Sequence, residues 1–233
     1  MKFQFAGYSD IGRRNTNEDA YRLCQTGSTL LAMVADGLGG HANGEVASKI
    51  AVDTLSGALE KEDIDEDALA YAILNASSAI RKARISGHST IAALWAGSGY
   101  AVAAHVGDTR IYQLRNSKII FQSVDHSAVQ MAVLVGELDA GAVRHHKDRN
   151  KLFRALGEEE APKVDITELT IQPADRFLLC SDGFWEPVTE EAMLRTMEQT
   201  DTAQAWLDSM TESVYAARDP RQDNHTAICI IAE

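Results

Sequence analysis

Four aspartates lie at the ends of short apolar runs, where carboxylates can take part in chemistry. They are Asp36 after Leu-Leu-Ala-Met-Val-Ala, Asp108 after Ala-Val-Ala-Ala-His-Val-Gly, Asp182 after Phe-Leu-Leu-Cys-Ser, and Asp223 shortly before Thr-Ala-Ile-Cys-Ile-Ile. Because short apolar runs favour buried β-strands, all four can point off the same rim of a sheet core. A carboxylate beside buried apolar residues is unfavourable unless it is paired or binds a cation. The set of four therefore predicts a metal centre.

The ligand atoms indicate which metal to expect. Carboxylates and water suit Mg²⁺ or Mn²⁺, whereas the three cysteines are far apart and form no cluster with histidine that would suit zinc. A single Asp-Gly after a strand is usually only a turn, so the prediction depends on the whole set. Several glycines flank the aspartates and let the backbone approach closely, so that a main-chain carbonyl can also be a ligand: Gly37, Gly39, Gly40, Gly107 and Gly183.

The elements that position these residues come in blocks. Strands are predicted at 3–8, an edge strand, and at 28–35, 89–96, 100–106, 110–114, 118–122, 164–171, 176–180 and 226–231. Helical spacing of apolar residues predicts helices at 43–59 and 65–84. Two more helices are expected before the last strand, the second beginning at the capping pair Asp201 and Gln204. Such blocks predict an α+β fold of packed antiparallel sheets covered by helix pairs.

Length and charge limit the functions to consider. A chain of 233 residues that is 45% hydrophobic is predicted to form one domain, 1–233. A net charge of −12 argues against nucleic acid as a partner. No signal-like apolar segment and no apolar run of about eighteen residues is present, so a cytoplasmic protein without direct membrane insertion is expected.

Six segments, in order along the chain, resemble motifs of the bacterial protein phosphatase 2C family. They are Arg14-Asn-Thr-Asn-Glu-Asp-Ala20, Val34-Ala-Asp-Gly-Leu-Gly-Gly-His41, His105-Val-Gly-Asp-Thr-Arg110, Leu152-Phe-Arg-Ala-Leu-Gly157, Leu179-Cys-Ser-Asp-Gly183 and Asp223-Asn-His-Thr226. The resemblance covers nearly the whole chain. It implies a four-layer αββα sandwich of two antiparallel sheets flanked by helix pairs, with a flap at about 126–155 near the metal site.

The resemblance also implies an activity. Members of this family are metal-dependent serine/threonine phosphoprotein phosphatases, in which a water activated by two metal ions attacks the phosphoryl group directly and no covalent phosphoenzyme forms. The implied cofactors are two core Mn²⁺ or Mg²⁺ ions and a third ion at a weaker site. The implied partners are phosphoserine and phosphothreonine proteins, and a cognate bacterial serine/threonine kinase whose action the phosphatase reverses.

Site residues follow from the matching motif positions. Asp36 resembles the carboxylate that bridges two metals, and Gly37 the residue that offers its backbone carbonyl to the first. Asp182 and Asp223 resemble ligands of the second metal, while Asp108 with Asp182 resembles the third, weaker site. The same comparison implies that Glu18 and Asp19 position water at the metals and that Arg14 clamps the phosphate.

The motifs leave two features of the site open. Some relatives carry a histidine as general acid where this chain has Leu38, so the group that protonates the leaving oxygen stays open, with His41 a candidate only by its closeness in sequence. Positive charge is concentrated in the flap, in Arg144, His145, His146, Lys147, Arg149, Lys151 and Arg154. It can steer an anionic phosphopeptide toward the metals or belong to a solvated loop.

Three other functions are compatible with the residues. One is a catalytically silent relative that binds phosphoprotein, although no principal ligand is missing. A second is a small phosphate-ester or nucleotide hydrolase, because clustered carboxylates alone do not specify the substrate. A third is an interaction domain whose aspartates need no cation, which would leave its stability unaffected by chelators.

Overall fold

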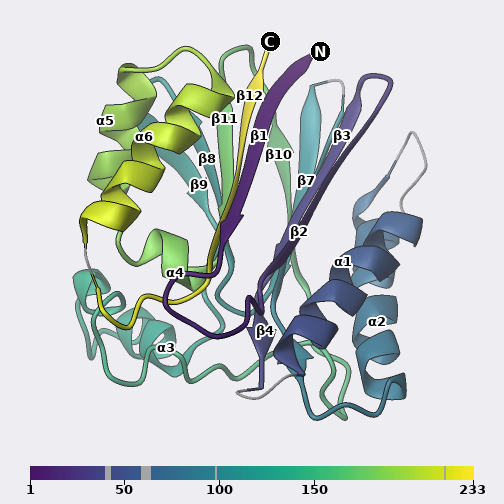
Figure 1. Cartoon of the computed structure of the whole chain (residues 1–233). Helices are drawn as coiled ribbons and strands as arrows, with labels where there is room; N and C mark the ends of the chain where they lie inside the picture. The colour runs from purple at the N-terminus through teal and green to yellow at the C-terminus, as the bar shows by residue number, and fades with distance from the viewer. Residues whose placement is uncertain (40–42, 59–63, 98, 218) are drawn as a thin grey trace.

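The computed structural model describes residues 1–39, 43–58, 64–97, 99–217 and 219–233. Two five-stranded β-sheets pack face to face, and helices cover the outer face of each sheet (Figure 1). The neighbouring strands pair in antiparallel fashion in both sheets. The predicted α+β sandwich, with helix pairs on both sides, is confirmed. No helix in the described ranges is long and apolar enough to cross a membrane.

The order of strands explains how distant segments meet. The first sheet runs β1 (Phe3–Asp10), β12 (His225–Ala232), β11 (Arg176–Cys180), β8 (Arg110–Arg115) and β9 (Lys118–Gln122). The second runs β10 (Asp165–Thr170), β7 (Tyr100–Val106), β6 (Ile91–Ala96), β3 (Thr29–Ala35) and β2 (Ala20–Thr26). A short ribbon pairs β4 (Gly37–Leu38) with β5 (His88–Ser89). As predicted, β1 is an edge strand.

Strand β3 shows how one apolar run supports two hydrophobic layers. Successive side chains of a strand point to opposite faces of its sheet. The even-numbered side chains from Leu30 to Val34 join the core between the sheets, and the odd-numbered ones from Leu31 to Ala35 join the core under the helices. An uninterrupted apolar run is therefore the expected pattern for a strand covered on both faces.

Each helix pair covers one sheet. Helices α1 (Gly44–Ala58) and α2 (Glu66–Lys82) pack on the second sheet, and α5 (Glu190–Glu198) and α6 (Ala203–Ala216) pack on the first (Figure 1). Helix α2 begins where predicted, because the Asp65 side chain accepts a hydrogen bond from the Ala68 N–H at 2.8 Å.

Three local predictions are wrong or incomplete. Strand β2 was not predicted, because many of its side chains, such as Arg22 and Gln25, are exposed and it lacks a clear apolar run. The predicted strand 89–96 is split at Thr90, whose hydroxyl accepts a hydrogen bond from the Asp36 N–H. An additional one-turn helix, α4 (Asp182–Trp185), precedes the two predicted C-terminal helices.

The predicted capping residue of the last helix is also wrong. Thr202, not Asp201, is the N-cap of α6, and its hydroxyl accepts a hydrogen bond from the Ala205 N–H at 3.1 Å. The Gln204 side chain does not close a capping box. It donates instead to Asp208, one turn further along the helix.

The predicted flap contains α3 (Ala128–Leu134) and a 3₁₀ turn (Ala140–Ala142), and lies at the end of the sandwich where α4 and β4 are found (Figure 1). The flap leaves and rejoins the body close to the same place. Ser127 pairs with Leu152, and Leu156 pairs with Ser89 next to β6. The segment is therefore fixed at both ends beside the predicted metal site.

Candidate metal centre and active site

A cavity of about 600 Å³ opens at this end of the sandwich. Its lining includes almost every residue that the sequence predicted for the site: Arg14, Glu18, Asp36, Gly37, Asp108, Asp182 and Asp223. The remaining predicted residue, Asp19, is buried, with only 8% of its surface exposed. The structure thus brings together residues that are separated by up to 209 positions in the chain.

Both sheets contribute aspartates to the cavity. Asp36 directly follows β3, and Asp108 lies two residues after β7 of the same sheet. From the other sheet, Asp182 begins α4 two residues after β11, and Asp223 lies two residues before β12. Because antiparallel neighbours start and end at one rim, this topology places all four carboxylates together, as predicted.

The backbone of Asp36 is held by the break between β5 and β6. Its N–H donates to the Thr90 hydroxyl at 2.9 Å, and its carbonyl accepts from the Thr90 N–H at 2.8 Å. The Ser89 hydroxyl donates to the same carbonyl at 3.1 Å. Thr90 and Thr109 share a short hydroxyl hydrogen bond of 2.5 Å. This network fixes where the Asp36 carboxylate emerges.

Gly37 lies where two backbone segments come very close. Its N–H donates to the Glu18 carbonyl at 3.1 Å. A Cβ atom at this position would lie 2.2 Å from the Gly44 carbonyl oxygen at the start of α1, much closer than real contacts allow. Glycine is therefore required here, and its backbone reaches the cavity without hindrance from a side chain.

Glu18 and Asp19 are positioned by residues that the sequence-based prediction of the site did not include. The Glu18 N–H donates to Asn224 Oδ1 at 2.8 Å, and the Asn224 amide donates in turn to the carbonyls of Ile11 and Thr16. Asp19 Oδ2 accepts from the Ser181 hydroxyl at 2.7 Å. Asp19 Oδ1 has no hydrogen-bond partner within the described ranges.

The cavity is electrostatically unfavourable for its own carboxylates. Burial, followed by the charge of neighbouring aspartates, raises the pKa of both Asp36 and Asp182 well above the usual range. Burial also raises the pKa of Asp108 to about 7 and that of Asp19 to about 6. A divalent cation would offset this repulsion, and the all-oxygen donor set with the unpaired Asp19 oxygen fits Mg²⁺ or Mn²⁺.

Arg14 lies in the cavity as predicted, in contact with a predicted metal ligand. Its Nε and Nη2 donate to Asp223 Oδ1 and Oδ2 at 2.8 and 2.5 Å. This bidentate pair is half-exposed, with 53% and 33% of the two side chains accessible. The guanidinium is therefore oriented by Asp223 while part of it still faces the cavity.

The wall behind Asp108 contains a buried ion pair that the sequence did not predict. Arg110 donates to both oxygens of Asp125 at 2.8 and 2.7 Å, and its guanidinium lies 3.5 Å from the ring centroid of Trp185. The Trp185 indole N–H donates to the Asp108 carbonyl at 3.0 Å. Arg110 and Asp125 lie 15 positions apart in the chain, so no local sequence pattern predicts that they contact each other.

His105, His126 and Asp165 form a second cluster, under the flap and away from the cavity lining. The Gly107 N–H donates to His126 Nδ1 at 3.0 Å, and His126 Nε2 lies 3.2 Å from Asp165. Arg154 already pairs with Asp165 at 2.9 Å, so an arginine side chain compensates the negative charge of this cluster. Its contacts tie the start of the flap to the turn before Asp108. His41, the proposed candidate acid, lies outside the described residues.

The fold and this cavity define a class: an αββα sandwich with an acidic site at one end of its two sheets. A model of the protein phosphatase 2C family matches residues 6–223. The chain belongs to the protein phosphatase 2C family, as the motifs predicted.

Known proteins of this family are similar over most of the chain. The serine/threonine protein phosphatase PstP of Mycobacterium tuberculosis is 33% identical over 218 residues, which cover 88% of this chain and 41% of that protein. The serine/threonine phosphatase stp of Listeria monocytogenes is 34% identical over 210 residues, with 83% and 82% covered. The chain thus spans about two fifths of the length of the mycobacterial relative.

A solved structure of the PstP catalytic domain in complex with two manganese ions superposes with a TM-score of 0.86. It is 27% identical and covers 99% of both chains. Sequence and structure comparisons thus agree on the family.

Proposed function

We propose that this chain is a metal-dependent serine/threonine phosphoprotein phosphatase. The observation that carries this proposal is the cavity in which carboxylates from both sheets meet beside the Arg14 guanidinium. The similarity to named serine/threonine phosphatases supports the reaction class, and the relative solved with manganese supports the cofactor.

The residues that would hold the ions are those with buried or clustered carboxylates. Asp36, the Gly37 carbonyl, Asp182 and Asp223 would hold two core ions, with Asp36 as a ligand common to both. Asp108 and Asp182 would hold a third, more weakly bound ion. Two divalent ions, when bound, lower the pKa of a water and offset charge on the phosphoryl oxygens.

The other residues act on water and phosphate. Glu18 and Asp19 position water, and the Ser181 hydroxyl and Asn224 amide hold these two residues in place. The Arg14 guanidinium binds the phosphoryl oxygens, for which its planar fork of donors is well suited. Asp223 sets the direction of that fork.

Direct attack by water agrees with the composition of the cavity. Among the described residues that line it, there is no serine, cysteine or histidine, and apart from Thr16 the groups that could accept a phosphoryl group are carboxylates that would be engaged with metal ions or water. Leu38, which also lines it, offers no proton to the leaving group. We propose phosphoserine and phosphothreonine proteins as substrates, with a cognate bacterial serine/threonine kinase and its substrates as partners.

A comparison of substrates tests this function. The purified chain is given a phosphothreonine peptide, a nucleotide and a small aryl phosphate, each with Mn²⁺ or with EDTA. We expect Mn²⁺-dependent hydrolysis with kcat/KM highest for the peptide by at least about tenfold. Faster hydrolysis of the nucleotide would indicate a small-ester hydrolase, and peptide binding without turnover would indicate a silent relative.

A further inference from the structure

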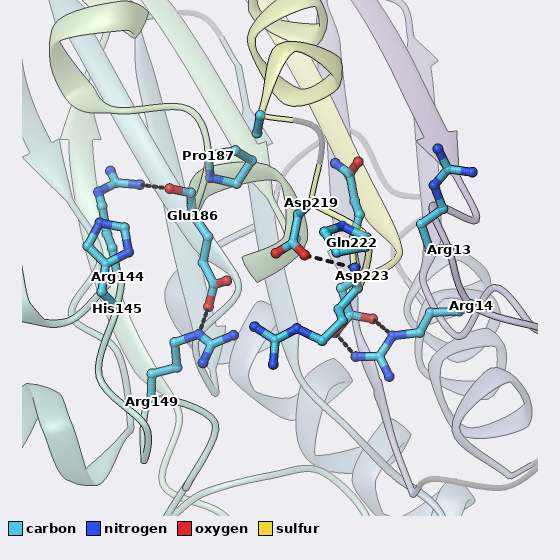
Figure 2. A pocket seen from close by; sticks show the side chains of 14 residues that line it. Arg13, Arg14, Arg144, His145, Arg149, Glu186, Pro187, Asp219, Gln222 and Asp223 are labelled. Carbon is cyan, nitrogen blue, oxygen red and sulfur yellow. Dashed lines mark hydrogen bonds and ion pairs between the residues drawn. The ribbon is translucent and has the colours of Figure 1, made fainter.

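A second cavity, of about 770 Å³, opens beside the metal site. Arg14 and Asp223 line both cavities, so the two adjoin. Figure 2 shows Arg144, Arg149 and Glu186 on one side of this second cavity, and Arg14 with Asp223 on the other. The flap and the loop before β12 thus form its two walls.

The lining of this cavity is basic in an acidic protein. Five arginines and three acidic residues line it, a surplus of two positive charges, whereas the whole chain carries −12. The five arginines are Arg13, Arg14, Arg144, Arg149 and Arg221, and the three acidic residues are Glu186, Asp219 and Asp223.

Most of these charges are already paired. Arg14 binds Asp223, Arg149 binds Glu186, and Arg144 donates to the nearby Glu190 at 2.6 Å. By contrast, the guanidinium groups of Arg13 and Arg221 form no hydrogen bond or ion pair with any residue that the structure describes, and both side chains are exposed. Two cations of the lining are therefore available to a ligand.

The loops that carry these two arginines are joined by their backbones. The Arg13 N–H donates to the Gln222 carbonyl at 2.9 Å. Gly12 has a φ of 62°, and a Cβ atom there would lie 2.2 Å from the Asp223 carbonyl, so only glycine permits this approach. The Arg221 N–H is held by the Asp219 carboxylate at 2.8 Å. Both arginines thus project from two loops whose backbones are in direct contact.

We infer that this cavity binds a second phosphoryl group of the phosphoprotein substrate, next to the residue that is being dephosphorylated. This inference rests on the proposed function. A phosphoryl group carries nearly two negative charges at neutral pH, which complement the surplus positive charge of the lining and the free guanidinium group of Arg221. Because the two cavities share Arg14 and Asp223 and an extended chain spans about 3.3–3.6 Å per residue, an anion within a few residues of the phosphorylated residue can reach the second cavity. The preferred substrates are segments with clustered phosphorylation.

Peptides with a second, non-hydrolysable anion test the inference. Each peptide has one phosphothreonine and, two or three residues to either side, alanine, glutamate or a phosphonate analogue of phosphoserine. We expect wild-type kcat/KM at low salt to be about tenfold higher with the phosphonate than with alanine, and about threefold higher with glutamate. Arg221→Ala should reduce the phosphonate preference to about threefold or less, and Arg13→Ala should also lower it.

Arg195→Ala is the matched control, because it also removes one exposed positive charge but lies on α5, outside the lining of both cavities. This variant should keep the wild-type preference. An unchanged preference in Arg221→Ala, or an equal loss in Arg195→Ala, would overturn the inference. Equal rates on all peptides would overturn it too but leave the phosphatase function standing, whereas no hydrolysis of any peptide would refute that function itself.

Discussion

At the residue scale, the carboxylates of the site differ from ordinary aspartates in their protonation. Burial raises the pKa of Asp19 to about 6 and that of Asp108 to about 7, above the value of about 3.9 expected in an unfolded chain. Between about pH 4 and 7 the native state therefore binds more protons at these groups than the unfolded state. Their contribution to the free energy of unfolding falls as pH rises through this window.

A comparison of Asp108→Asn with wild type in the presence of EDTA isolates the contribution of Asp108 to the pH dependence of the free energy of unfolding. Buried His126, whose pKa is lowered by burial to about 4, acts in the opposite sense, but it is common to both proteins and cancels in the comparison. We expect the variant to gain stability relative to wild type as pH rises from about 4 to 7, by up to about 1.4 kcal/mol per pH unit. Urea unfolding at several pH values measures this difference. A difference that is independent of pH would contradict the prediction.

The buried pair of Arg110 and Asp125 gives a second prediction at this scale. Their side chains are 4% and 2% exposed, so removal of the aspartate deprives a buried guanidinium of its bidentate partner and leaves it only the more distant Glu190, at 3.6 Å. Asp125→Ala should lower the free energy of unfolding by about 3–5 kcal/mol. Asp53→Ala is the matched control, because it removes the partner of Arg22 in a half-exposed pair, and should cost less than about 1 kcal/mol. Similar small losses in both variants would show that the buried pair is not important.

At the scale of elements, the site depends on the close approach of β4 to the start of α1. Gly37→Ala would place a methyl group 2.2 Å from the Gly44 carbonyl oxygen and should lower the free energy of unfolding by about 1–3 kcal/mol. Gly57→Ala, also on α1, is the control. A Cβ atom there would meet nothing within 4 Å, so this variant should be neutral or stabilising by up to about 1 kcal/mol. Denaturation of both variants checks this, and an equally stable Gly37→Ala would contradict the packing described.

The flap gives a prediction about charge. Arg149 on the flap pairs with Glu186 after α4, and both residues line the second cavity. If the flap steers anionic peptides, Arg149→Glu should lower kcat/KM about threefold to tenfold and weaken its dependence on salt, because the screened attraction is reduced. Arg195→Glu on α5 is the control and should keep the wild-type slope. An unchanged slope in Arg149→Glu would indicate a flap without a steering role.

At the scale of the whole molecule, the sequence predicts what depends on local pattern. The apolar runs before Asp36 and Asp182 determine β3 and β11, and because strands of an antiparallel sandwich end at a common rim, the convergence of the aspartates also follows. Strand β2 has an exposed face and lacks such a run. Its pairing with β3, rather than its own composition, makes it a strand.

Contacts between distant segments were beyond prediction from pattern. The Ser181 hydroxyl bonds Asp19 across 162 positions, and Asn224 bonds Glu18 across 206. The pairing of Arg14 with Asp223 likewise depends on β1 and β12 being neighbours in one sheet. Motifs identify the residues of the site, whereas the tertiary fold decides which of them hold one another.

The central claim is that the aspartate cluster binds divalent ions that the reaction requires. The most direct test measures hydrolysis of a phosphothreonine peptide by wild type and by Asp36→Asn as Mn²⁺ is added, with circular dichroism to show that both are folded. We expect activity in the wild type that rises with Mn²⁺ and is abolished by EDTA, and a loss of at least about a thousandfold in the variant. Wild-type hydrolysis that persists in EDTA, or a folded Asp36→Asn variant with full activity, would contradict this account.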